Sequence, residues 1–125
     1  MALLNSGRDH IAQDLVGEAV TEFNNANSYL CVGNGTTAFN AAQTDLQGAS
    51  KLRKAMDATY PQRTNNVLTF RSTFGTSEAN FAWEEWGVAN DPTAGTLLNR
   101  KVETLGTKNS NQTWQFTVDI TVNAA

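Results

Sequence analysis

The chain has 125 residues, of which 40% are hydrophobic and 17% charged, and its formal net charge is −3. This length is typical of one domain with its own core, and the acidic balance excludes a nucleic-acid-binding surface, which needs a basic footprint. No run approaches the roughly 18 apolar residues of a membrane span, and the N-terminus does not resemble a signal peptide. A single cysteine and a single histidine exclude an intrachain disulfide and the usual thiolate or imidazole zinc sites.

The first predicted element is a short helix over residues 6–16. Ser6 is the expected N-cap, because its side chain can accept a hydrogen bond from the first turn. Ile11 and Leu15 are four residues apart and give the helix one apolar stripe. His10 adjoins this stripe, so we expect it at the surface or rim of the helix.

About six strands are predicted to follow, each ending at a turn rich in Gly, Pro, Asn or Asp. They cover residues 28–32, 53–60, 67–76, 81–88, 96–105 and 114–122. The last strand alternates most regularly, and the apolar face predicted to line the core holds Trp114, Phe116, Val118, Ile120 and Val122. The fold class is therefore mainly β, an antiparallel β-sandwich with one short N-terminal α-helix, as a single domain over residues 1–125.

The stretch 81–88 contains two of the three tryptophans and is the expected centre of the core. Alternation places Trp83 and Trp86 on opposite faces of a strand covered on both sides. Glu85 shares a face with Trp83, and a buried carboxylate needs partners. We expect it to accept hydrogen bonds from backbone amides of a nearby turn or to pair with a cation such as Arg71 or Arg100. The structural anchors predicted in this way are Trp83, Glu85, Trp86, Gly87, Trp114 and Phe116.

Patterns that carry chemistry are missing from the sequence. Glu84 and Glu85 are adjacent, so on a strand they point to opposite faces and cannot flank one bond. Cys31 lies in an apolar run away from His10, which favours a small buried hydrophobic residue over a nucleophile. The glycine pair at 33–35 lacks the lysine of a phosphate-binding loop. We therefore expect no catalytic activity, no cofactor and no bound metal.

Several short motifs together resemble a known family. They are Val32-Gly33-Asn34-Gly35, Asp45-Leu46, Phe70-Arg71-Ser72-Thr73-Phe74, Glu85-Trp86-Gly87-Val88, Gly95-Thr96-Leu97-Leu98-Asn99-Arg100 and Lys108. This layout, over roughly residues 6–122, resembles small structural proteins of tailed bacteriophages and is similar to the N-terminal domain of tail-collar and tail-fibre proteins. Those domains have an early helix, a turn of valine, glycine, a polar residue and glycine, and a strand with Glu-x-Gly before an apolar residue.

The resemblance implies a non-enzymatic virion protein, assembled in the host cytoplasm, that acts through contacts with other tail or capsid subunits. A tail, fibre-attachment or minor tail component is the first expectation. The chain ends at Ala125 without the shaft or tip of a fibre, so a capsid decoration protein is the alternative. A further alternative is a carbohydrate-binding module, in which one of Trp83 and Trp86 would stack on a sugar ring.

Virion sites are symmetric, so we expect a homo-oligomer, with a trimer as the state suggested by fibres and decoration proteins. Residues 1–5 form an apolar tail that a small core does not need. We expect this tail or the helix after it to contact a neighbouring subunit. The predicted interaction residues are Leu3, Leu4 and His10.

Overall fold

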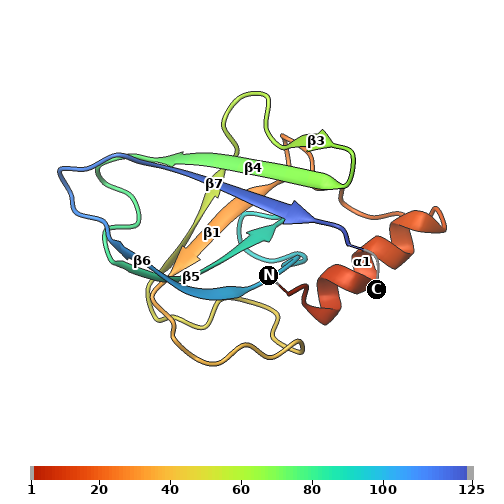
Figure 1. Cartoon of the computed structure of the whole chain (residues 1–125), viewed down its shortest axis with the longest axis horizontal. Coiled ribbons are helices and arrows are strands. Elements are labelled where there is room, and N and C mark those ends of the chain that lie inside the picture. Colours follow the sequence, from red (N-terminus) through yellow and green to blue (C-terminus); the bar gives the residue numbers. More distant parts are fainter. Residues whose placement is uncertain (1, 124–125) are drawn as a thin grey trace.

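Two antiparallel sheets face each other in the computed structural model, which describes residues 2–123 (Figure 1). One sheet has the strand order β2-β1-β5-β6 and the other has the order β3-β4-β7. The protein is mainly β, with one short N-terminal helix, as the sequence predicts. The elements are α1 (Asn5–Leu15), β1 (Tyr29–Gly33), β2 (Lys51–Ala55), β3 (Gln62–Thr64), β4 (Val67–Phe74), β5 (Ala82–Ala89), β6 (Lys101–Thr107) and β7 (Trp114–Thr121).

The main core between the sheets is centred on Trp83, whose side chain is 1% exposed. Its ring meets those of Phe74, Trp114 and Phe116 edge to face at 4.8, 4.9 and 5.5 Å. Trp86 contacts the same Phe116 ring at 5.9 Å. The prediction that the two tryptophans lie on opposite faces is therefore wrong. The β5–β6 register shifts between residues 83 and 85, and this irregularity breaks the alternation and leaves both indoles in one core.

A second, smaller core covers the other face of the first sheet. Its members are buried apolar residues from the N-terminus, β1, the 34–50 loop, β5 and the segment before β6, namely Leu4, Cys31, Leu46, Ala89 and Leu97. Strand β5 is thus covered on both sides, as predicted. Leu4 is completely buried within its own chain. The expectation that residues 1–5 form a tail unneeded by the core is wrong for Leu4, which cannot reach a neighbour.

Helix α1 packs against the segment before β6 through backbone and small residues. The Leu4 amide donates to the Leu98 carbonyl at 3.1 Å, and the Ser6 hydroxyl donates to the Leu97 carbonyl at 2.8 Å. Ser6 is therefore not the N-cap; Leu4 occupies that position and has no capping side chain. A Cβ at Gly7 would collide with the Leu98 carbonyl, so only glycine permits this approach.

The predicted apolar stripe of the helix is only half used. Ile11 packs against the main core, but Leu15 is 82% exposed. His10 is buried and not at the rim, because its ring lies edge to face on Phe23 at 4.9 Å and its Nε2 is 2.9 Å from the Thr21 carbonyl oxygen.

Several strand boundaries also differ from prediction. The strand predicted over residues 53–60 is β2, which begins at Lys51 and ends at Ala55. The short strand β3 does not correspond to any predicted strand, and the strand predicted over residues 96–105 begins later, as β6. On β7, Val118 and Ile120 are buried, while Trp114 and Phe116 are partly buried and packed on the core. Val122 is 51% exposed, so its predicted core position is wrong; the strand ends one residue before it.

Candidate functional site

A buried ion pair lies beneath the 34–50 loop. Arg100 Nε donates to Glu85 Oε2 at 2.7 Å, and both side chains are fully buried. The backbone amides of Gln47 and Gly48 also donate to the Glu85 carboxylate, at 3.0 and 2.8 Å. Both kinds of partner expected for Glu85 are therefore present. Arg100 reaches the loop as well, through Nη1 to Gln43 Oε1 at 3.1 Å.

Glycines make room for this arrangement. A Cβ at Gly33 or Gly35 would come within 2.5 or 2.7 Å of Glu85 Oε1, and one at Gly48 would meet Gly35 N at 2.6 Å. The Val-Gly-Asn-Gly turn is thus shaped to admit a buried carboxylate. Glu85 is fully buried and accepts three hydrogen bonds, so its carboxylate stabilises the loop.

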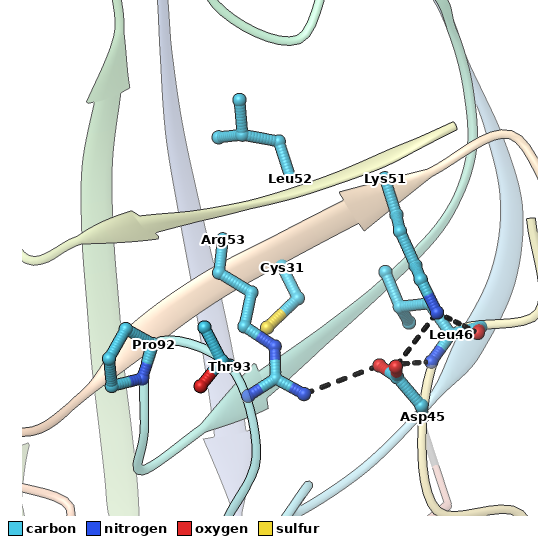
Figure 2. Close-up of a pocket in the computed structure, with 8 residues that line it drawn as sticks. All are labelled: Cys31, Asp45, Leu46, Lys51, Leu52, Arg53, Pro92 and Thr93. Carbon is cyan, nitrogen blue, oxygen red and sulfur yellow. Dashed lines mark hydrogen bonds and ion pairs between the residues drawn. The ribbon is translucent and has the colours of Figure 1, made fainter. Parts of the chain in front are cut away.

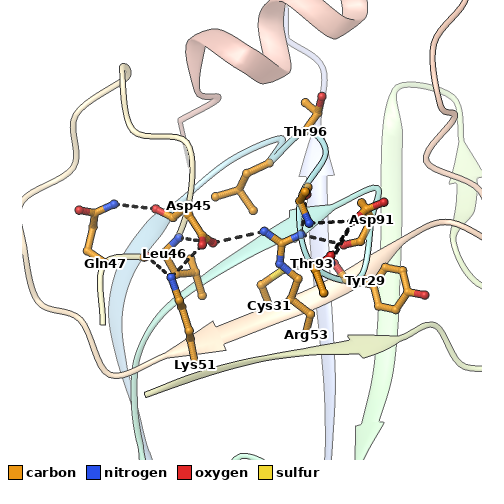
Figure 3. Close-up of polar contacts among 12 residues, drawn as sticks. Tyr29, Cys31, Asp45, Leu46, Gln47, Lys51, Arg53, Asp91, Thr93 and Thr96 are labelled. Carbon is orange, nitrogen blue, oxygen red and sulfur yellow. Dashed lines mark hydrogen bonds and ion pairs between the residues drawn. The ribbon is translucent and has the colours of Figure 1, made fainter. Parts of the chain in front are cut away.

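A second polar cluster lies at the outer face of β1 and β2, around a pocket of about 220 Å³ (Figure 2). Lys51 Nζ and Arg53 Nη2 both pair with Asp45, at 2.8 and 3.3 Å. Arg53 Nη1 also donates to the carbonyls of Asp91 and Ala94, at 2.7 and 2.8 Å. Figure 3 shows how Arg53 joins the loop that carries Asp45 to the turn that begins at Asp91.

Cys31 lies beside this cluster, and its thiol is buried as predicted. Burial raises the pKa of the Cys31 thiol to about 12, and the nearby Arg53 charge lowers it only partly. The thiolate that a nucleophile or metal ligand needs is therefore scarce near neutral pH. The pocket around Arg53 is a structural junction between two loops and β2.

The remaining anchors also serve the fold. Trp83 and Trp86 are 1% and 5% exposed, so neither can form the sugar-stacking surface of a carbohydrate-binding module. A Cβ at Gly87 would collide with the Asn99 carbonyl, so this glycine lets β5 approach the neighbouring segment closely. Glu84 accepts a hydrogen bond from the Thr104 hydroxyl.

An apolar groove lies between α1 and the β3-β4-β7 sheet, with a cavity volume of about 410 Å³. Figure 1 shows α1 beside the C-terminal end of β7. We call this the α1 groove. Its lining is mainly apolar and includes Leu3, Ile11, Leu15, Phe23, Leu68 and Val122. Of the three predicted interaction residues, Leu3 and His10 line the groove and Leu4 does not.

Charged residues border the α1 groove on both sides. Asp14 and Glu22 lie on the wall formed by the helix and the segment after it, and Arg63 of β3 lies on the opposite wall. A hydrogen bond with Asp14, slight desolvation and the Asp14 charge together raise the pKa of the exposed Glu22, and the nearby His10 opposes this shift. Within residues 2–123, none of these three charged residues takes part in an ion pair.

The sequence patterns do not reveal most of this groove, because they place Leu15 in the apolar stripe of the helix and Val122 in the core. The available signal was the apolar pair Leu15-Val16 at the very end of the helix, beyond the last turn that the core can cover.

Among the residues that the structure describes, no group of three His, Cys, Asp or Glu side chains is arranged to hold a metal ion. The only described helix is too short and too polar to cross a bilayer. No protein-family model matches the chain. The search of curated proteins likewise gives no match.

Proposed function

We propose that this chain is a non-enzymatic structural protein of a tailed bacteriophage, most directly a tail, fibre-attachment or minor tail component. It would act through contacts with other virion proteins. The proposal starts from the motifs that resemble tail-collar and tail-fibre domains, among them Val32-Gly33-Asn34-Gly35 and Glu85-Trp86-Gly87-Val88. The observation that carries it is the α1 groove, which is an apolar surface open to solvent.

Two exposed apolar side chains, Leu15 and Val122, line this groove, and Val16 follows Leu15 in sequence. Leu15, Val16 and Val122 are 82%, 73% and 51% exposed. Isolated apolar residues on a surface are ordinary, but a group beside an apolar groove with a polar rim is typical of a protein–protein contact. Water contact with these side chains is unfavourable, and a partner that covers them gains from their burial.

The two polar clusters support the same role because they hold irregular loops in one shape. Arg100 and Glu85 fix the 34–50 loop to β5, and Arg53 joins this loop to the turn at 91–94. A surface that is already ordered loses less conformational entropy when it binds. This rigidity is useful to a subunit that must occupy the same position in every particle.

The test is fractionation of the phage particles in which the chain is produced, followed by mass spectrometry of separated heads and tails. We expect the chain in purified particles and in the tail fraction. Recovery with heads would favour the capsid decoration alternative, and absence from purified particles would overturn the proposal.

A pair of variants links the result to the groove. Leu15→Glu puts a charge into the apolar surface, so we expect less of the chain to be retained in particles. Ala12→Glu is the matched control, because Ala12 is also exposed on α1 but does not line the groove. Equal retention of both variants would mean that another surface makes the contact.

A further inference from the structure

The two walls of the α1 groove carry opposite charges. Asp14 and Glu22 lie on the helix wall, and Arg63 lies on the strand wall. Arg63 Nη1 donates to the Asn65 carbonyl at 2.8 Å, which leaves its charge without a carboxylate partner within residues 2–123. A surface that has an acidic wall, an apolar floor and a basic wall is complementary to a rotated copy of itself.

We propose that the α1 groove is a self-association surface, covered by the α1 groove of a second copy of this chain. This inference rests on the proposed function, because it names the protein that covers the groove. The charge pattern favours a second copy, because the acidic wall of one copy is complementary to the basic wall of the other.

The charges also select the orientation. A two-fold axis along the groove sets the helix wall of one copy opposite the strand wall of the other. Arg63 of each copy then faces Asp14 and Glu22 of its partner, and the contact occurs twice. A two-fold axis across the groove would instead bring the acidic walls together, and like charges in contact oppose association.

The exposed apolar residues fit the same arrangement. Leu15 belongs to the helix wall and Val122 to the wall formed by the sheet. In the proposed dimer, Leu15 of one copy therefore packs near Val122 of the other. Val16, the residue after α1, extends the apolar area. Burial of these side chains provides the attraction, and the charged rims determine the register.

The test is sedimentation velocity of the purified full chain from about 1 μM to about 1 mM, a range that covers weak and moderate affinities. We expect the mass to rise from one chain to two. Glu22→Arg and Arg63→Glu should each raise the dissociation constant at least about tenfold, because each places like charges opposite one another at both contacts.

The decisive sample is an equimolar mixture of the two variants. A heterodimer of Glu22→Arg with Arg63→Glu has an acid opposite a base at both contacts, so we expect it to associate about as tightly as the unchanged chain. Arg8→Glu is the matched control, because Arg8 is exposed on α1 but does not line the groove; it should leave the dissociation constant unchanged.

An unchanged chain that stays monomeric throughout the series would overturn the inference, and so would a dimer that neither charge reversal weakens. A mixture that fails to recover association would overturn the proposed register. These results are separate from particle fractionation: a monomeric chain that is found in particles contradicts only the self-association, whereas a dimer that is absent from particles contradicts only the virion role.

Discussion

The Arg100 guanidinium lies 2.7 Å from the Glu85 carboxylate, and neither side chain is exposed to solvent. Two charges buried together are tolerated because each satisfies the other and the loop amides supply the remaining donors. Arg100 Nη2 is buried without a hydrogen-bond partner among the described residues, so this guanidinium depends on Glu85 for most of its compensation. The pair connects β5 to the 34–50 loop through two residues that are 15 positions apart in sequence.

Glu85→Gln should lower the free energy of unfolding by about 3–5 kcal/mol, because it leaves Arg100 as an uncompensated buried charge. Glu84→Gln is the control on the same strand; its carboxylate is partly exposed, and the loss should stay within about 0.5 kcal/mol. Urea denaturation measures both. Similar losses for the two variants would contradict the importance of the buried pair.

Cys31 should be inert in the native protein. Its buried thiol has its pKa raised to about 12, so near pH 8 almost none is thiolate, and access is also blocked. A chromogenic disulfide reagent should react slowly with folded protein and rapidly in denaturant. Ser110→Cys provides the control, because residue 110 is exposed in the loop before β7. Equal rates for Cys31 in the folded and unfolded states would show that the thiol is accessible.

Two residues on β7 and just beyond it test where the core ends. Ile120 is 2% exposed, so Ile120→Ala should cost about 2–5 kcal/mol. Val122 is 51% exposed, and Val122→Ala should change stability by less than about 0.5 kcal/mol. Thermal and urea unfolding of the two variants compare them directly. A cost for Val122→Ala close to that of Ile120→Ala would place residue 122 in the core.

Asp45 makes stability depend on pH in the acidic range. Burial raises the pKa of Asp45, but hydrogen bonds from Lys51 and the Leu46 amide and the charges of Lys51 and Arg53 together bring it below the ordinary 3.8. The unfolded chain therefore binds this proton at a higher pH than the folded chain. The stability that Asp45 contributes is therefore fully present above the pKa of the unfolded chain, and it is lost as the pH falls through the lower pKa of the folded chain.

The measurement is the urea midpoint between about pH 5 and about pH 2, where acidic groups of this kind titrate. Asp45→Asn should flatten the decline of the midpoint with acid, because the titrating group is gone. An identical decline in the variant would show that Asp45 does not contribute to the acid dependence.

Local patterns in the sequence were enough to predict the fold class and the partners of Glu85. A carboxylate inside an apolar strand must be compensated, and this requirement predicts turn amides or a cation such as Arg71 or Arg100 as partners. The structure shows Arg100 and the loop amides in this role, while Arg71 pairs with Asp57. Alternation likewise predicted Val118 and Ile120 as core residues. These inferences worked because each depends on one strand and on the cost of burying one group.

Features that depend on how distant segments meet could not be predicted. The contact of Gly7 with the Leu98 carbonyl determines where α1 lies, and this placement leaves Leu15 exposed. The register shift at 83–85 is not encoded in the alternation of β5 alone. Arg53 contacts residues 8 to 41 positions away, so its role as a junction appears only in the folded chain.

The most direct test of the central claim is thiol labelling at the α1 groove in assembled particles. Leu15→Cys introduces an accessible thiol into a chain whose own Cys31 is buried. We expect labelling at residue 15 to be at least about tenfold slower in particles than in dilute free protein, because a partner covers the groove. Ser110→Cys should react at the same rate in both. Equal labelling of Leu15→Cys in particles and in free protein would contradict the assignment of the α1 groove as the contact surface.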